Sequence, residues 1–305
     1  MESILSDWSQ RIRASAASKR PLRLRGGGTK DFYGQDLEGE VFDTRGYSSI
    51  VAYEPSELVI TARCGTRLAD IETAMSEHGQ MLAFGGQVMK NVAGYDVSRL
   101  MAGSLGTLGI ILEVSLKVQP RPAAEATLRL ELPEDKAIET LNKWGGKPLS
   151  ISASAWMGGE LGMRLSGAAA AVKSTREKIG GELVDAAQGE RFWAGIREQT
   201  DPFFRNDAPL WRISVPSATP PLKLPGEPLI EWGGALRWLC SRADARTVRD
   251  AAKRARGHAT LFRGGDKSVG AFQPLAPVLM KIHKELKREF DPQGIFNRGR
   301  MYPEL

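Results

Sequence analysis

The chain has 305 residues, of which 42% are hydrophobic and 26% charged, and its formal net charge is +6 at pH 7. This length accommodates two domains with hydrophobic cores, and the composition is typical of a soluble globular protein. The basic residues are scattered and form no helix-turn-helix, zinc-finger or RNA-binding pattern, which argues against nucleic acid as a partner. The charge is typical of a mildly basic cytoplasmic protein, or it favours anionic ligands such as a pyrophosphate, a small carboxylate or an acidic subunit.

The cysteines and the apolar runs indicate where the protein resides. Cys64 and Cys240 are the two cysteines, and they fit no metal-binding or redox spacing, so we expect a reducing compartment and no metal site. Residues 1–18 lack the apolar core of a signal peptide, and no apolar run is long enough to span a bilayer. We therefore expect a cytoplasmic protein that contacts a membrane only indirectly, through its partners.

The first 120 residues predict an α+β domain. Apolar residues at helical spacing predict a helix near the start of the chain, and a short strand then leads into a glycine cluster. This order does not match the alternating strands and helices of a Rossmann unit. The predicted elements are a helix at 4–12, strands at 22–24, 41–44, 49–53 and 58–62, a helix at 67–78, and a strand at 110–118.

Pro120 and Pro122 break the last of these strands and predict a domain boundary, with one domain at 1–120 and a C-terminal domain at 121–305. Alternating apolar and polar residues beyond the prolines predict an antiparallel sheet with helices on one face, which is a second α+β unit. Predicted strands lie at 127–132, 151–156, 162–165 and 210–215. Predicted helices lie at 136–144, 168–179 and 248–255, and a last helix carries apolar residues 275, 278, 279, 282, 286 and 290 on one face.

Two glycine clusters carry the strongest functional signal. The first follows a strand and offers consecutive backbone N–H groups, which bind phosphate oxygens without needing a particular side chain. Read alone, such a run is more often a simple turn, and it lacks the Walker A pattern. The first cluster is Arg25, Gly26, Gly27, Gly28, Thr29 and Lys30, and the second ends in Leu105, Gly106, Thr107, Leu108, Gly109, Ile110 and Ile111.

The second cluster closes the stretch from Lys90 to Ile111, which resembles a segment that lies along FAD in the vanillyl-alcohol oxidase and p-cresol methylhydroxylase family of flavoproteins. The first cluster resembles the pyrophosphate loop of the same family. The resemblance implies a p-cresol methylhydroxylase-type FAD-binding domain, followed by an α+β antiparallel-sheet domain of the FAD-linked oxidase type. It also implies that residues 25–30 and 105–111 bind FAD.

Longer segments resemble one branch of that family, the FAD-binding accessory subunits of bacterial glycolate oxidase. They include residues 57–66, 84–118, 226–238 and 290–301, and the resemblance runs from residue 22 to the end of the chain. It implies a heteromeric flavoenzyme that oxidises glycolate, a 2-hydroxy acid, to glyoxylate. The implied partners are a larger flavin-containing subunit and an iron–sulfur subunit that receives the electrons.

The chain departs from these subunits in the middle of the flavin domain. The family carries a further glycine-rich, phosphate-binding stretch there, whereas in this chain Leu82 and Ala83 join directly to Phe84. A smaller departure is Arg298, where the family usually has proline. The missing stretch leaves two interpretations open: a flavin-containing catalytic subunit, or a non-catalytic scaffold subunit of the same complex that has lost FAD binding.

No Ser-His-Asp arrangement, metal-ligand spacing or paired carboxylate identifies a catalytic residue, so redox chemistry has to come from the flavin. Three residues are candidates for binding the substrate carboxylate. Arg212 and Arg237 lie in apolar, strand-like segments, where a half-buried guanidinium grips a carboxylate or pairs with a structural acid such as Glu231. His258, close to Arg263 in sequence, is the third candidate.

Overall fold

A computed structural model describes residues 2–77 and 97–305 of the protein. The chain forms two compact units: the first comprises Met1–Arg121 together with Pro274–Leu305, and the second comprises Pro122–Gln273. The first division falls at the prolines that predicted it. The expected continuous C-terminal domain at 121–305 is wrong for its last segment, because Ile295 packs into the core of the first unit. Residues 78–96, on which part of the resemblance rests, lie outside the described residues.

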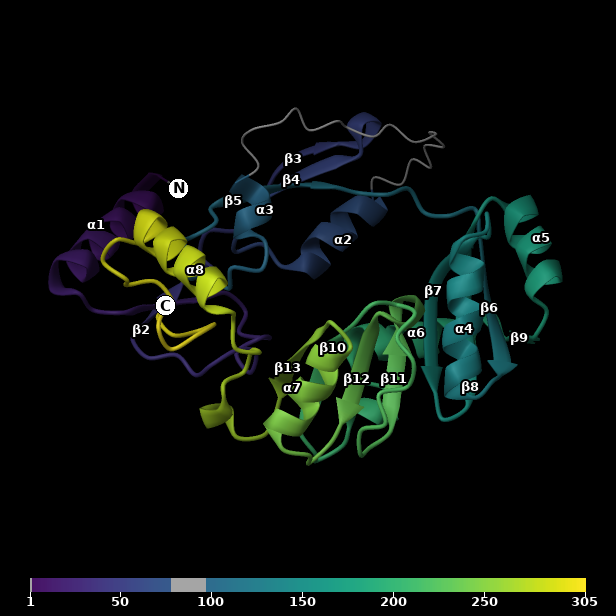
Figure 1. Cartoon of the computed structure of the whole chain (residues 1–305). Coiled ribbons are helices and arrows are strands. Elements are labelled where there is room, and N and C mark those ends of the chain that lie inside the picture. The colour runs from purple at the N-terminus through teal and green to yellow at the C-terminus, as the bar shows by residue number, and fades with distance from the viewer. Residues whose placement is uncertain (1, 78–96) are drawn as a thin grey trace. The chain divides into compact units, whose positions relative to one another are not determined.

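The first unit contains two small sheets (Figure 1). One is a parallel pair and the other is antiparallel in the order β3-β4-β5. A buried core that includes Trp8, Phe42 and Ile295 joins the first helix to the parallel pair and to the C-terminal segment. The strands are β1 (Leu22–Arg25), β2 (Glu40–Asp43), β3 (Ile50–Glu54), β4 (Val59–Arg63) and β5 (Glu113–Lys117), and the helices are α1 (Glu2–Ser18), α2 (Leu68–Glu77), α3 (Val97–Met101) and α8 (Pro277–Phe290).

Helix α8 reverses the expected amphipathic pattern. Its apolar residues lie on one face in the sequence pattern, yet Val278 is 71% exposed, and Leu279 and Ile282 are also exposed. The buried residue of this helix is Lys287, which is only 7% exposed. None of the described helices, α8 included, is long and apolar enough to cross a membrane.

The second unit is one antiparallel sheet of eight strands in the order β13-β10-β12-β11-β7-β8-β6-β9. The antiparallel sheet predicted from the alternating pattern is confirmed. The strands are β6 (Ala124–Glu131), β7 (Ile151–Met157), β8 (Glu160–Gly167), β9 (Glu182–Val184), β10 (Leu210–Ser214), β11 (Pro228–Glu231), β12 (Leu236–Cys240) and β13 (His258–Arg263).

Helices cover the two faces of this sheet unequally (Figure 1). Side chains such as Leu128 and Ile213 form the core beneath three helices, and neighbouring residues on each strand point to the opposite face. The three helices are α4 (Glu134–Gly145), α5 (Ala169–Ile179) and α7 (Ala245–Arg254). The prediction of helices on one face only is wrong, because α6 (Ala186–Glu198) packs on the opposite face through Ile196.

Helix α6 escaped prediction because two glycines interrupt its apolar pattern. A Cβ at Gly189 would lie 2.6 Å from the hydroxyl oxygen of Thr127 on β6, so glycine permits the close approach of helix and strand. The indole Nε1 of Trp193, one turn further along, donates to the same hydroxyl at 2.9 Å. Helix α6 therefore covers only part of its face of the sheet and leaves the polar residues beside it uncovered.

Candidate functional site

The first glycine cluster lies in the first unit, directly after β1. Within the described part of the chain, the backbone N–H groups of residues 26–29 donate to no internal acceptor. A Cβ at Gly27 would meet no atom within 4 Å, so the loop presents unpaired N–H donors beside open space. This arrangement fits the phosphate oxygens of a dinucleotide.

Charged side chains flank this loop. The Nε of Arg25 lies 2.7 Å from a carboxylate oxygen of Asp31, and Arg23 lies 3.2 Å from the same oxygen. The Lys30 ammonium lies 5.5 Å from the centre of the Phe32 ring. Two arginines therefore share a single carboxylate, which leaves a net positive field at the loop for an anionic ligand.

The second cluster adjoins the first. A Cβ at Gly106 would come within 3.3 Å of Leu24, on the strand that leads into the first loop. The hydroxyl of Thr107 donates to the carbonyl of Ser104 at 2.7 Å, so this side chain closes a turn. Ile110 packs into the core of the unit and Ile111 is exposed. The remaining predicted residues, Leu108 and Gly109, are half-buried.

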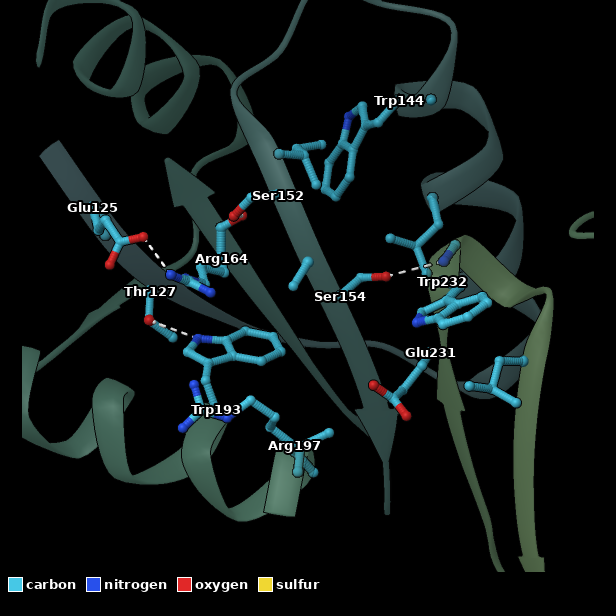
Figure 2. Close-up of a pocket in the computed structure, with 18 of the residues that line it drawn as sticks. Glu125, Thr127, Trp144, Ser152, Ser154, Arg164, Trp193, Arg197, Glu231 and Trp232 are labelled. Carbon is cyan, nitrogen blue, oxygen red and sulfur yellow. Dashed lines mark hydrogen bonds and ion pairs between the residues drawn. The ribbon is translucent and has the colours of Figure 1, made fainter. Parts of the chain in front are cut away.

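A second candidate site is a cavity of about 1190 Å³ in the second unit, lined by residues of the sheet and of α6 and, from the opposite face, by Leu141 and Trp144 of α4. Trp144, Trp193 and Trp232 border the cavity on three sides, and Glu231 projects toward it (Figure 2). Arg164 on β8 pairs with Glu125 on β6 along one side of the cavity. Aromatic walls with a few charged groups are typical of sites for small organic ligands.

Arg212 is a cation of this cavity that has charge available for a ligand, and Lys147 also lines the cavity. Its guanidinium lies 5.7 Å from the ring centre of Trp232 and 6.0 Å from that of Trp238. Among the described residues it makes no ion pair or hydrogen bond, whereas Arg197 in the same cavity pairs with Glu198 at 2.6 Å. A guanidinium within cation–π distance of two aromatic rings, whose N–H groups have no acceptor among the described residues, is suited to bind a carboxylate.

Two titratable groups accompany Arg212. The Nε1 of Trp238 donates to Glu231 at 2.7 Å, and burial raises the pKa of the Glu231 carboxyl despite that bond and the charge of Arg212. Burial and the positive charge of Arg212 lower the pKa of His258. A histidine with a lowered pKa is neutral at neutral pH, so Arg212 supplies the positive charge of this group.

The second candidate arginine has a structural role, which differs from our expectation. Arg237 is 2% exposed, and its guanidinium donates to the backbone carbonyls of Gly234, Pro220 and Thr219. Burial lowers the pKa of this guanidinium. The side chain lies on the face opposite Arg212, because successive residues of a strand alternate between faces and Arg212 pairs with Trp238, the next residue along β12. Arg237 thus holds the segment that contains Thr219 and Pro220, which lies between β10 and β11, to the sheet.

The sequence interpretation missed several polar residues of the first unit. Lys287, Asp291, Asn297 and Arg300 are all buried and form hydrogen bonds with one another or with backbone groups near the two glycine clusters. In the sequence, the only indication that Asp291, Asn297 and Arg300 matter was that residues 290–301 resemble the family described above. No group of three or more His, Cys, Asp or Glu among the described residues has a geometry that holds a metal ion.

Comparisons with known proteins agree with this arrangement. A family model for an FAD binding domain matches residues 5–106. Glycolate oxidase subunit GlcE of Escherichia coli K12 is 41% identical over 352 residues, which cover 98% of this chain and 99% of that protein. Glycolate oxidase subunit GlcD of Bacillus subtilis 168 is 45% identical over 67 residues, or 21% of this chain and 14% of that protein. The structure of p-cresol methylhydroxylase aligns with a TM-score of 0.67 at 13% identity, covering 95% of this chain and 85% of that one.

Fold and glycine loops together define an FAD-containing flavoprotein of the p-cresol methylhydroxylase type. Within that class, the chain belongs to the family of glycolate oxidase subunit GlcE. Its cofactor is FAD, which the loop at residues 26–29 fits through its unpaired N–H groups. The alignment with the Escherichia coli subunit is 352 residues long and this chain has 305, so several tens of residues of that subunit have no counterpart here.

We predict that Gly27→Asp abolishes FAD binding and leaves the fold intact. The carboxylate would enter open space, so it would not strain the chain, but it would repel phosphate. Flavin retained after gel filtration measures the effect, and circular dichroism checks the fold. Gly46→Asp is the matched control, since a Cβ there also meets nothing within 4 Å. Equal flavin retention in both folded variants would remove this loop from the FAD site.

Proposed function

We propose that this chain is the FAD-binding subunit of a heteromeric enzyme that oxidises glycolate to glyoxylate and passes the electrons to an iron–sulfur subunit. The observation that carries the proposal is the 41% identity to Escherichia coli glycolate oxidase subunit GlcE over nearly the whole of both chains. The identity to subunit GlcD over 67 residues supports a larger flavin-containing partner of related sequence. We further propose that the complex is cytoplasmic and meets a membrane only through partner subunits.

Each unit of the chain, taken by itself, offers one set of binding residues to this proposal. Bound FAD would supply the redox chemistry of the proposed reaction, as the acceptor of the two electrons that leave the alcohol carbon. The loop at residues 26–29 binds the pyrophosphate through backbone N–H groups, with Arg25 and Lys30 adding positive charge. In the second unit, the guanidinium of Arg212 binds the carboxylate of the 2-hydroxy acid, while the rings of Trp232 and Trp238 lie within cation–π distance of it.

The alternative is a non-catalytic scaffold subunit, which the shorter flavin domain favours. The experiment that separates the two uses the whole complex, co-expressed with its two partner subunits. If this chain carries a working flavin, Gly27→Asp in the complex lowers both the flavin content and glycolate-dependent dye reduction. If both stay at the wild-type level while the complex remains assembled, the chain is a scaffold and the catalytic proposal is wrong.

We predict that Arg212→Gln weakens glycolate binding to the purified chain by about ten- to a hundredfold, the cost of one charged hydrogen-bonded contact. Tryptophan fluorescence reports binding, because Trp232 and Trp238 contact the guanidinium. Arg197→Gln is the matched control: it lines the same cavity, but Glu198 already neutralises it. Equal glycolate affinities in the two variants would contradict the role of Arg212.

Glycolate affinity should fall as the pH rises through the titration of Glu231. Below the raised pKa of this carboxyl the group is neutral, and Arg212 keeps its full charge for the substrate anion. Above it, the carboxylate competes with the substrate for Arg212. In Glu231→Gln, which keeps an oxygen for the Trp238 N–H, the affinity should stay high and independent of pH over the same range. An unchanged pH profile in that variant would exclude Glu231 as its cause.

A further inference from the structure

The C-terminal segment of the first unit contains a cluster of buried polar side chains, none of which belongs to the two glycine clusters. We call Lys287, Asp291, Asn297 and Arg300 the tail cluster. Each of the four is at most 8% exposed. Burying charged and amide groups is costly unless each is hydrogen-bonded, so the partners of these side chains show what the cluster holds in place.

Asn297 joins the two glycine clusters with one side chain. Its Oδ1 accepts the backbone N–H of Leu24 at 2.7 Å, and its Nδ2 donates to the carbonyl of Leu105 at 2.6 Å. Leu24 lies on the strand that leads into the first loop, and Leu105 opens the second cluster. Asn297 itself has a positive φ of 40°, a conformation that asparagine tolerates better than most residues. Its amide therefore fixes the separation between the two clusters.

Lys287 and Asp291 hold the second cluster and the tail together. The Lys287 ammonium donates to Asp291 and to the carbonyls of Thr107 and Phe296, each at 2.7 Å. Asp291 also accepts the backbone N–H groups of Ile295 at 3.1 Å and Phe296 at 2.8 Å. All three protons of the ammonium thus have acceptors, one of them on the second glycine cluster.

Arg300 holds the far side of the first loop. Its guanidinium donates to the carbonyls of Lys30 at 2.9 Å, Gln35 at 3.1 Å and Asp31 at 3.3 Å. The cluster therefore binds carbonyls from both loops, at Lys30, Leu105 and Thr107. The N–H groups of residues 26–29 are left without acceptors in the described chain and remain available to a ligand.

We propose that the tail cluster is a positioning device for FAD, and that Asn297 is the positioning residue that sets the distance between the two flavin loops. The tail does not touch the cofactor in this proposal; it fixes the loops in the spacing that FAD requires. The two equilibria are then linked. If the docked tail raises the affinity of the chain for FAD by some factor, bound FAD raises the equilibrium constant for docking of the tail by the same factor. A purely structural tail would gain only the general stabilisation that any ligand of the folded chain provides.

The decisive variant is Asn297→Asp, which keeps the acceptor for Leu24 and loses the donor to Leu105. It should weaken FAD binding at least about tenfold, measured by quenching of FAD fluorescence on titration of the apo chain. Ile60→Val, in the core of the antiparallel sheet, is the control for general loss of stability. It should lower the melting temperature of the apo chain and leave the FAD affinity unchanged.

Hydrogen exchange of the wild-type chain gives a test that needs no variant. FAD should slow amide exchange in residues 291–300 and 24–29 by more than in residues 59–63 of β4, which report the general stabilisation that any bound ligand provides. The proposal is overturned if Asn297→Asp binds FAD within twofold of the wild type while its melting temperature falls. Exchange in residues 291–300 that is insensitive to saturating FAD, or a wild-type chain that binds no FAD, would overturn it equally.

Discussion

The side-chain amide of Asn297 connects two backbone segments that lie far apart in the sequence, at Leu24 and Leu105. Buried polar atoms require partners, so this amide constrains both segments at once. The same contact explains a glycine of the second cluster. A Cβ at Gly106 would lie 2.6 Å from the amide nitrogen of Asn297. The glycine is therefore required by the tail of the chain, in addition to any approach of the cofactor.

This constraint accounts for the organisation of the first unit. Residues 274–305 belong to it because Ile295 joins the core around Trp8, and because the tail cluster binds both glycine loops. The chain lacks several tens of residues that the Escherichia coli subunit has, yet its two glycine clusters are still neighbours. The second unit adds a partly uncovered sheet face, where the guanidinium of Arg212 makes no ion pair or hydrogen bond with the described residues. The net charge of +6 thus includes local positive charge at both sites.

The sequence predicted most of the strands and the glycine loops, since alternation and glycine density are local signals. It failed where a contact between distant residues decides the outcome. Lys287 looks like the polar side of helix α8, and nothing nearby in sequence shows that the carbonyl of Thr107, 180 residues away, is one of its three acceptors. For Arg237, the sequence left a ligand and a structural partner as alternatives, and the loop carbonyls that bind it carry no recognisable pattern. Helix α6 was hidden because Gly189 serves the packing against β6, which no helical periodicity reveals.

The central claim is that the first unit, closed by its tail, is a complete FAD site. The most direct measurement is a visible-absorbance titration of the purified, flavin-free chain with FAD, followed by gel filtration. The account predicts saturation at one FAD per chain, a shifted and structured flavin band, and flavin that elutes with the protein. A spectrum that stays identical to that of FAD in solution, with a folded but colourless protein fraction, would contradict it.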